Sequence, residues 1–159
     1  MSIRNVIIGV DPGKHGAIAV YYPHNGKILV ENFLGDEDAF NIVSQIRDFA
    51  FIERCGIVAY MELVGGFIQG NPASGSSMFN FGDNFGYWRG LFRMAKIPLR
   101  LVRPQKWQAG LALGKTKGVE RKRALKDAAS RIYPNLKCTL ANSDALLILD
   151  YARRTEARK

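Results

Sequence analysis

The pattern of hydrophobic positions changes along the chain and predicts strands first, then a mixture of strands and helices. Residues 6–10, Val-Ile-Ile-Gly-Val, form a short apolar run that is typical of a strand covered on both faces. Residues 17–22 and 27–33 have the composition of two further strands, with turn residues between the segments. Because the three segments follow one another closely, we expect them to pair as an antiparallel meander.

After residue 35, helical and strand patterns alternate. Apolar residues at helical spacing (Ile42, Ile46, Phe49) indicate the first helix. The elements predicted here are a helix at 36–51, a strand at 56–61, a helix at 77–96, a strand at 98–102, and helices at 104–112, 119–133 and 143–154. This order predicts an α/β fold over residues 1–159, a single domain with a five-stranded mixed sheet flanked by helices.

The helix predicted at 77–96 carries an unusual stripe of small residues. Gly82, Gly86 and Gly90 recur every four residues, although each glycine costs a helix about 1 kcal/mol relative to alanine. A stripe of this kind permits another backbone to approach closely. We expect it to pack inside the protomer, with a partner subunit as the alternative.

Basic and acidic side chains are distributed unevenly along the chain. The net charge is +9, and residues 100–159 carry 15 basic and 5 acidic side chains, whereas residues 1–99 carry 8 and 9. A basic half predicts a polyanionic partner, most often nucleic acid, although a solvated surface is the plainer interpretation.

Composition also excludes several classes of protein. Cys55 and Cys138 are far apart in sequence, which excludes zinc-finger spacing and argues against a disulfide framework. No apolar run approaches the roughly 20 residues of a membrane span, and the first residues lack the apolar core of a signal peptide. We therefore expect a cytoplasmic protein with no membrane partner.

Three acidic residues stand at the ends of predicted elements. Asp11 follows the first strand, Glu62 follows the fourth, and Asp144 lies in the first turn of the last helix. If the first and fourth strands are parallel neighbours, Asp11 and Glu62 emerge at one edge of the sheet, where open α/β sheets bind ligands. Converging carboxylates favour a divalent cation, Mg²⁺ with Mn²⁺ as a substitute. Singly, each acid also fits a turn, surface or helix-terminal role.

Three segments occur in a characteristic order, with an Arg103-Pro104-x-x-Trp107 motif and a basic helix between the last two. The segments are residues 9–20, GVDPGKHGAIAV, residues 60–64, YMELV, and residues 142–148, NSDALLI. Over roughly residues 5–154 the chain resembles the RuvC-type Holliday junction resolvases of the ribonuclease H-like superfamily, its short phage-encoded members above all. The resemblance implies a homodimeric endonuclease that nicks four-way DNA junctions symmetrically, in recombination or repair, in a bacterial or phage-infected cytoplasm.

The resemblance also implies roles for individual residues. It makes Asp11, Glu62 and Asp144 both the catalytic acids and the ligands of the metal ions that promote phosphodiester hydrolysis. A fourth acid of the family, one helical turn before the last, corresponds to Ala141 here, so the number of metal ions is open; Asn142 offers an amide oxygen as a weak ligand. The residues expected to contact DNA are Lys14, Phe67, Lys106, Lys115, Lys117, Arg121 and Lys122. For these, a solvated face or, for Phe67, a minor core position is the alternative.

Other functions fit parts of the sequence. A non-catalytic junction-binding protein needs the basic half but not the three acids. Another ribonuclease H-like nuclease, cutting branched DNA or RNA–DNA hybrids, would use the same acids. A P-loop is disfavoured because Ala109 stands where that motif needs glycine before Gly114. The Asp11-Pro12-Gly13 turn also resembles the phosphate loop of actin- and hexokinase-like kinases, which need two such domains.

Overall fold

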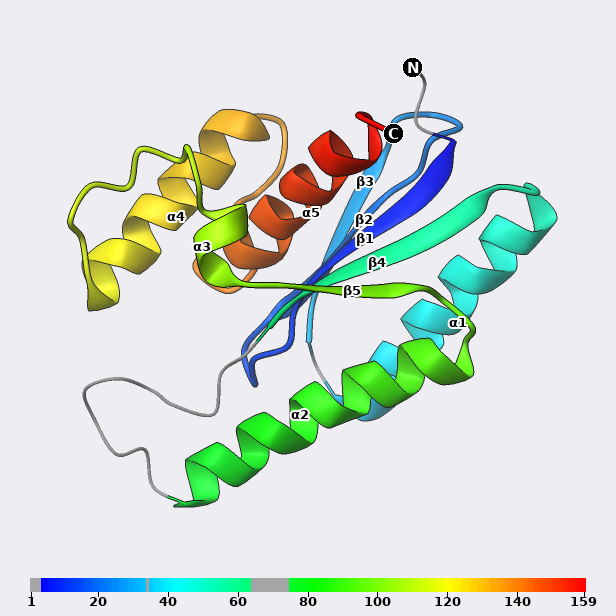
Figure 1. Ribbon diagram of the computed structural model, residues 1–159, viewed down its shortest axis with the longest axis horizontal. Coiled ribbons are helices and arrows are strands. Elements are labelled where there is room, and N and C mark those ends of the chain that lie inside the picture. Colours follow the sequence, from blue (N-terminus) through cyan, green and yellow to red (C-terminus); the bar gives the residue numbers. More distant parts are fainter. Residues whose placement is uncertain (1–3, 34, 64–74) are drawn as a thin grey trace.

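A computed structural model, which describes residues 4–33, 35–63 and 75–159, has the mixed α/β architecture that the sequence predicts. Five strands form one sheet in the order β3-β2-β1-β4-β5 (Figure 1). The strands are β1 (Asn5–Asp11), β2 (Ala17–Tyr21), β3 (Ile28–Asn32), β4 (Gly56–Glu62) and β5 (Leu99–Val102). β1, β2 and β3 pair antiparallel, whereas β4 is parallel to β1 and β5 is parallel to β4. The predicted meander and the predicted parallel strands are both confirmed.

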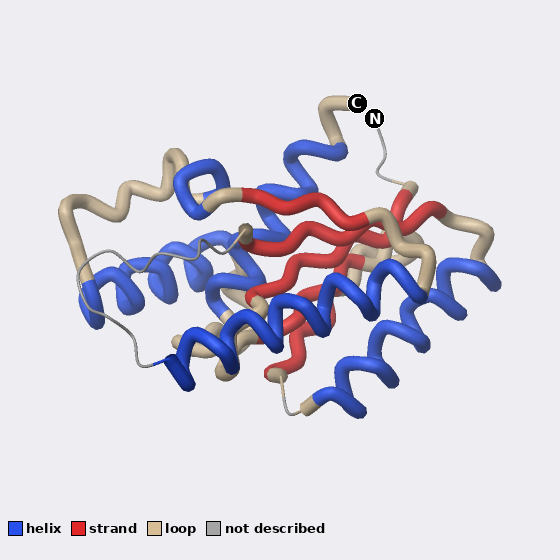
Figure 2. Tube along the Cα trace, turned by 60° about the horizontal axis from the view of Figure 1, so that its bottom comes forward, coloured by secondary structure: helices blue, strands red, loops and turns tan. Residues whose placement is uncertain are grey.

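Helices cover both faces of this sheet (Figures 1 and 2). The helices are α1 (Asp36–Ile52), α2 (Gly75–Met94), α3 (Pro104–Trp107), α4 (Gly118–Ile132) and α5 (Ser143–Glu156). α1 and α2 pack on one face, and α5 packs on the other, where α4 covers it. In the part of the chain that is described, no helix is long and apolar enough to cross a membrane.

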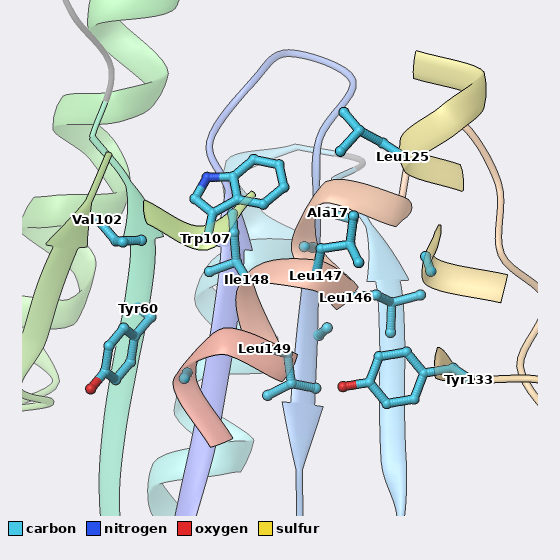
Figure 3. Packing of buried hydrophobic residues seen from close by; sticks show 14 of the residues in the cluster. Ala17, Tyr60, Val102, Trp107, Leu125, Tyr133, Leu146, Leu147, Ile148 and Leu149 are labelled. Carbon is cyan, nitrogen blue, oxygen red and sulfur yellow. The ribbon is translucent and has the colours of Figure 1, made fainter. Parts of the chain in front are cut away.

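Alternation along the strands divides the hydrophobic core into two layers. On β1, Val6, Ile8 and Val10 point toward α1 and α2, while Ile7 points toward α5. The α5 layer is shown in Figure 3, with α5 side chains packed between Trp107 and Tyr133. Each fully buried side chain of this size contributes roughly 1.5–3 kcal/mol to folding. The central strand is therefore held rigidly from both sides.

α5 crosses β1 in direct backbone contact, and a glycine makes this possible. A Cβ atom built on Gly9 would lie 2.5 Å from the backbone nitrogen of Leu149 and 2.6 Å from the carbonyl oxygen of Ala145. No side chain fits at such distances, so Gly9 sets how closely α5 approaches the sheet. The first turn of α5 is consequently fixed above the carboxyl end of β1.

One predicted helix is shorter than expected. The helix expected at 104–112 ends at Trp107, because Gly110, Ala112 and Gly114 all have positive φ, at 81°, 49° and 61°, and turn the chain. This loop leads into α4.

The glycine stripe of α2 does not pack inside the protomer. No atom of the described residues lies within 4 Å of a Cβ atom built on Gly82, Gly86 or Gly90, and the stripe faces away from the sheet. Trp88 and Phe92, four residues apart, form the buried face of α2 instead. The two aromatic rings bury more apolar area than three glycines can, so they determine which face of α2 packs against the sheet.

Candidate active site

The sheet brings two acids to one edge. Asp11 is the last residue of β1 and Glu62 is the last residue of β4. These strands are parallel neighbours in a register that pairs Val10 with Met61, so the residues that follow them emerge side by side. Asp144 lies in the first turn of α5, which Gly9 holds above the same edge. The charges of all three carboxylates interact, as their sequence positions predicted.

Burial and mutual repulsion act on two of these carboxylates. Burial, followed by the charges of Asp11 and Asp144, raises the pKa of Glu62 to about 7. Burial, followed by the charge of Asp144, also raises the pKa of Asp11. The Gly13 N–H donates to Asp11 Oδ1 at 3.1 Å and opposes that rise in pKa. Asp11 therefore stabilises its own turn with one carboxylate oxygen.

Trp107 fixes the position of Glu62, a contact that the sequence analysis missed. The indole Nε1–H donates to Glu62 Oε2 at 3.0 Å, and the ring is almost wholly buried. The spacing Arg103-Pro104-x-x-Trp107 was noted in the sequence, but it carries no sign of a partner 45 residues away. The bond restricts the orientation of Glu62, whose carboxylate interacts electrostatically with Asp11 and Asp144.

Lys122 is a basic residue that interacts with all three acids. Its Nζ, on α4, donates to Asp144 Oδ2 at 2.5 Å. Burial lowers the pKa of Lys122, but the negative charges of Asp144, Asp11 and Glu62 together raise it by a larger amount. The pKa therefore lies above its ordinary value, and the ammonium stays protonated. The other oxygen of Asp144, Oδ1, is buried and has no hydrogen-bond partner among the described residues.

The donor set fits a divalent cation. Within the described ranges, no three His, Cys, Asp or Glu side chains are close enough to form a metal site as they stand. However, Asp144 Oδ1 is a buried anionic oxygen without a partner, and Lys122 is one cation among three carboxylates. Carboxylate oxygens suit Mg²⁺ or Mn²⁺ rather than zinc. A small movement of the side chains toward a bound cation would relieve the repulsion that raises the pKa of Glu62.

Asn142 stabilises the turn that leads into α5. Its Oδ1 accepts from the backbone N–H of Thr139 at 2.8 Å, and its Nδ2 donates to the carbonyl oxygen of Lys137 at 3.0 Å. The amide oxygen has a second lone pair, so the interpretation of Asn142 as a weak ligand stays a prediction.

The residues predicted to contact DNA are in different environments. Lys14 lies exposed in the turn after Asp11, Lys106 lies exposed on α3, and Lys115 and Lys117 lie exposed in the loop before α4. Arg121 donates to Gln108 Oε1 at 2.6 Å and so braces this loop. Phe67 lies outside the described residues.

The raised pKa of Glu62 predicts a pH-dependent stability. Folded Glu62 keeps its proton up to about pH 7, whereas the unfolded chain releases it near 4.5, so the free energy of unfolding falls as the pH rises between these values. In EDTA, Glu62→Gln should be more stable than the wild type by about 1–3 kcal/mol at pH 8 and equal to it at pH 4.5. Urea unfolding at both pH values measures this, with Glu31→Gln on the exposed strand β3 as the control. Equal stability of Glu62→Gln and wild type at pH 8 would show that Glu62 is not destabilised by its surroundings.

Comparison with known proteins identifies the fold. No protein-family model matches the chain, and no curated protein matches its sequence. A structure of Thermus thermophilus RuvC in complex with a Holliday junction substrate matches with a TM-score of 0.59 and 16% identity, covering 96% of this chain and 94% of that one. A second Thermus thermophilus RuvC structure matches with a TM-score of 0.55 and 15% identity, covering 96% and 95%. The chain therefore has a RuvC-like fold over nearly its whole length.

Proposed function

We propose that the protein is a Mg²⁺-dependent endonuclease that resolves four-way DNA junctions by paired nicks, a short phage-like member of the RuvC type acting in the cytoplasm. The observation that carries this proposal is the convergence of Asp11, Glu62 and Asp144 at one edge of the sheet, where a buried oxygen of Asp144 has no hydrogen-bond partner in the described ranges. The basic half of the chain supplies charge for DNA, and the matching RuvC structure holds a junction substrate.

Each site residue has a distinct part in this proposal. Asp11, Glu62 and Asp144 would hold the metal ion, with Glu62 kept in place by Trp107. When bound, the metal supplies Lewis-acid stabilisation of the phosphate and a more acidic water for attack. Lys122, whose side chain is 49% exposed, can release Asp144 and donate to a phosphate oxygen of the strand to be cut. Lys14, Lys115 and Lys117 are exposed and would contribute positive charge for the flanking phosphates.

Resolution of a junction requires two cuts, so we propose a homodimer with one site per subunit. The exposed Gly82, Gly86 and Gly90 stripe of α2 is the face that we assign to the partner. Phe79, on the first part of the same helix, is 73% exposed and adds apolar area to this face. Sedimentation equilibrium should give twice the mass of one chain, and a monomer at micromolar concentration would contradict the assignment.

The substrate is tested with a panel of labelled DNAs in Mg²⁺. We expect nicks in the four-way junction, no cleavage of linear duplex, and no cleavage of any substrate by Asp11→Asn. Cleavage of a fork or an RNA–DNA hybrid instead of the junction would keep the active site but overturn the substrate. Tight, salt-sensitive binding without any cleavage would favour a non-catalytic junction-binding protein.

A further inference from the structure

A basic groove lies beside the candidate active site, along the outer strand of the sheet. We call it the edge groove; its polar and aromatic lining residues are Tyr60, Arg100, Arg103, Lys106, Tyr151 and Thr155. They come from β4, β5, the start of α3 and the last part of α5. In the described chain, β5 has β4 as its neighbour on one side and forms the end of the sheet on the other.

The charge of the edge groove is only partly balanced by the protein. Arg100 Nη1 pairs with Glu156 Oε1 at 3.0 Å, and Lys159 pairs with the same oxygen at 2.7 Å. The side chain of Glu156 is 8% exposed and forms ion pairs with both cations. Arg103 and Lys106 are exposed and make no ion pair with any described residue. The groove therefore offers two uncompensated positive charges to an anion.

One wall of the groove is held in a fixed geometry. Tyr60 Oη donates to Glu156 Oε1 at 2.6 Å and accepts from Arg100 Nη1 at 3.0 Å. The Arg100 guanidinium also lies over the Tyr60 ring, 5.6 Å from its centre, and Tyr151 packs edge-on against Tyr60. Although Arg100 is anchored in this way, its side chain remains 46% exposed. Its remaining N–H groups can therefore bind an anion at a low cost in side-chain entropy.

The edge groove is continuous with the acids. Tyr60 and Glu62 are two residues apart on β4 and so lie on the same face of the sheet, about 7 Å apart along the strand. Lys106 is adjacent in sequence to Trp107, which donates to Glu62. One strand of a nucleic acid carries a phosphate about every 3.4 Å along the helix axis. A backbone that enters the active site therefore reaches the groove within about one or two nucleotides.

We propose that the edge groove binds a backbone phosphate of the DNA strand that is cut, about one or two nucleotides from the scissile phosphate. Arg103 and Lys106 neutralise this phosphate, and Arg100 supplies a preorganised donor beside it. The position of the phosphate relative to the cut rests on the proposed nuclease function, whereas the anion site itself does not. The continuity with the acids favours a DNA strand over an acidic peptide as the occupant.

The first test is the salt dependence of DNA binding. Binding of a labelled four-way junction is measured in EDTA for wild type, for the double variant Arg103→Gln/Lys106→Gln, and for Lys27→Gln/Arg54→Gln. The control pair removes the same charge at the opposite end of the sheet from the acids. We expect the slope of log Kd against log salt to fall by about 1–2 in the groove variant, as for one or two lost phosphate contacts, and to stay unchanged in the control. Equal slopes in the two variants would overturn the proposal.

The second test locates the phosphate. A single neutral methylphosphonate is moved along one strand of the junction, and binding is measured again without metal. At one or two adjacent positions we expect neutralisation to weaken binding by the wild type but not by Arg103→Gln/Lys106→Gln. Absence of any such position would overturn the proposal. Neither test needs cleavage. A wild type that binds the junction but never cuts it would refute the proposed nuclease function, and the two binding tests would still decide whether the edge groove binds a phosphate.

Discussion

Asp144→Asn is expected to lower junction cleavage by at least about 10³-fold, equivalent to about 4 kcal/mol of activation free energy. Asparagine keeps the shape of the side chain and can still accept from Lys122, but it removes the negative charge beside Asp11 and Glu62. Without that charge the site would lose one of the three proposed ligands for the metal ion. Cleavage rates are measured under single-turnover conditions with saturating protein, so that weak binding does not contribute.

The same variant should bind the junction at least as tightly as the wild type, because it removes a negative charge that faces the DNA. Asp150→Asn is the matched control on the same helix, since Asp150 lies six residues further along α5 and pairs with Arg154. We expect the control to cut at the wild-type rate. Full activity of Asp144→Asn, or loss of junction binding by the folded variant, would contradict the role given to Asp144.

Gly9→Ala is expected to destabilise the protein by about 3 kcal/mol or more, at the upper end of the usual cost of overpacking. The added methyl group meets backbone atoms of Leu149 and Ala145, which cannot rotate away as a flexible side chain can. α5 must therefore move off the sheet, and Asp144 moves with it. Urea denaturation measures the stability, and cleavage by the folded fraction measures the displacement of Asp144.

Ala157→Ser is the control for this substitution. It adds one heavy atom at an exposed residue directly after α5, so it should change the free energy of unfolding by no more than about 0.5 kcal/mol. If Gly9→Ala also had the stability of the wild type, the close crossing of α5 over β1 would be wrong.

The sequence predicted the parts of the fold that depend on local pattern. The apolar run in β1 and the short turns of the meander determine the first three strands, because strands joined by so few residues pair with their neighbours. Asp11 and Glu62 could be placed at one edge of the sheet, since a helix between two strands makes them parallel. Asp144 was found from its position in the first turn of an apolar helix.

Contacts between distant segments were not predictable in the same way. The bond from Trp107 to Glu62 and the pairing of Lys122 with Asp144 depend on how α3 and α4 pack, which no spacing in the sequence reveals. The α2 stripe was assigned to the wrong side because glycine spacing shows that one face is small without showing what covers it. The side of the helix was decided instead by the larger burial of Trp88 and Phe92.

We propose that two active sites, one in each subunit of the dimer, cut a four-way junction together. A supercoiled plasmid with an extruded cruciform distinguishes coordinated from independent cutting, because paired cuts within one bound complex give linear DNA directly. In Mg²⁺ we predict linear product without accumulation of nicked circles, and no product in EDTA. Nicked circles as the lasting product, or an intact plasmid bound by the protein, would contradict the account.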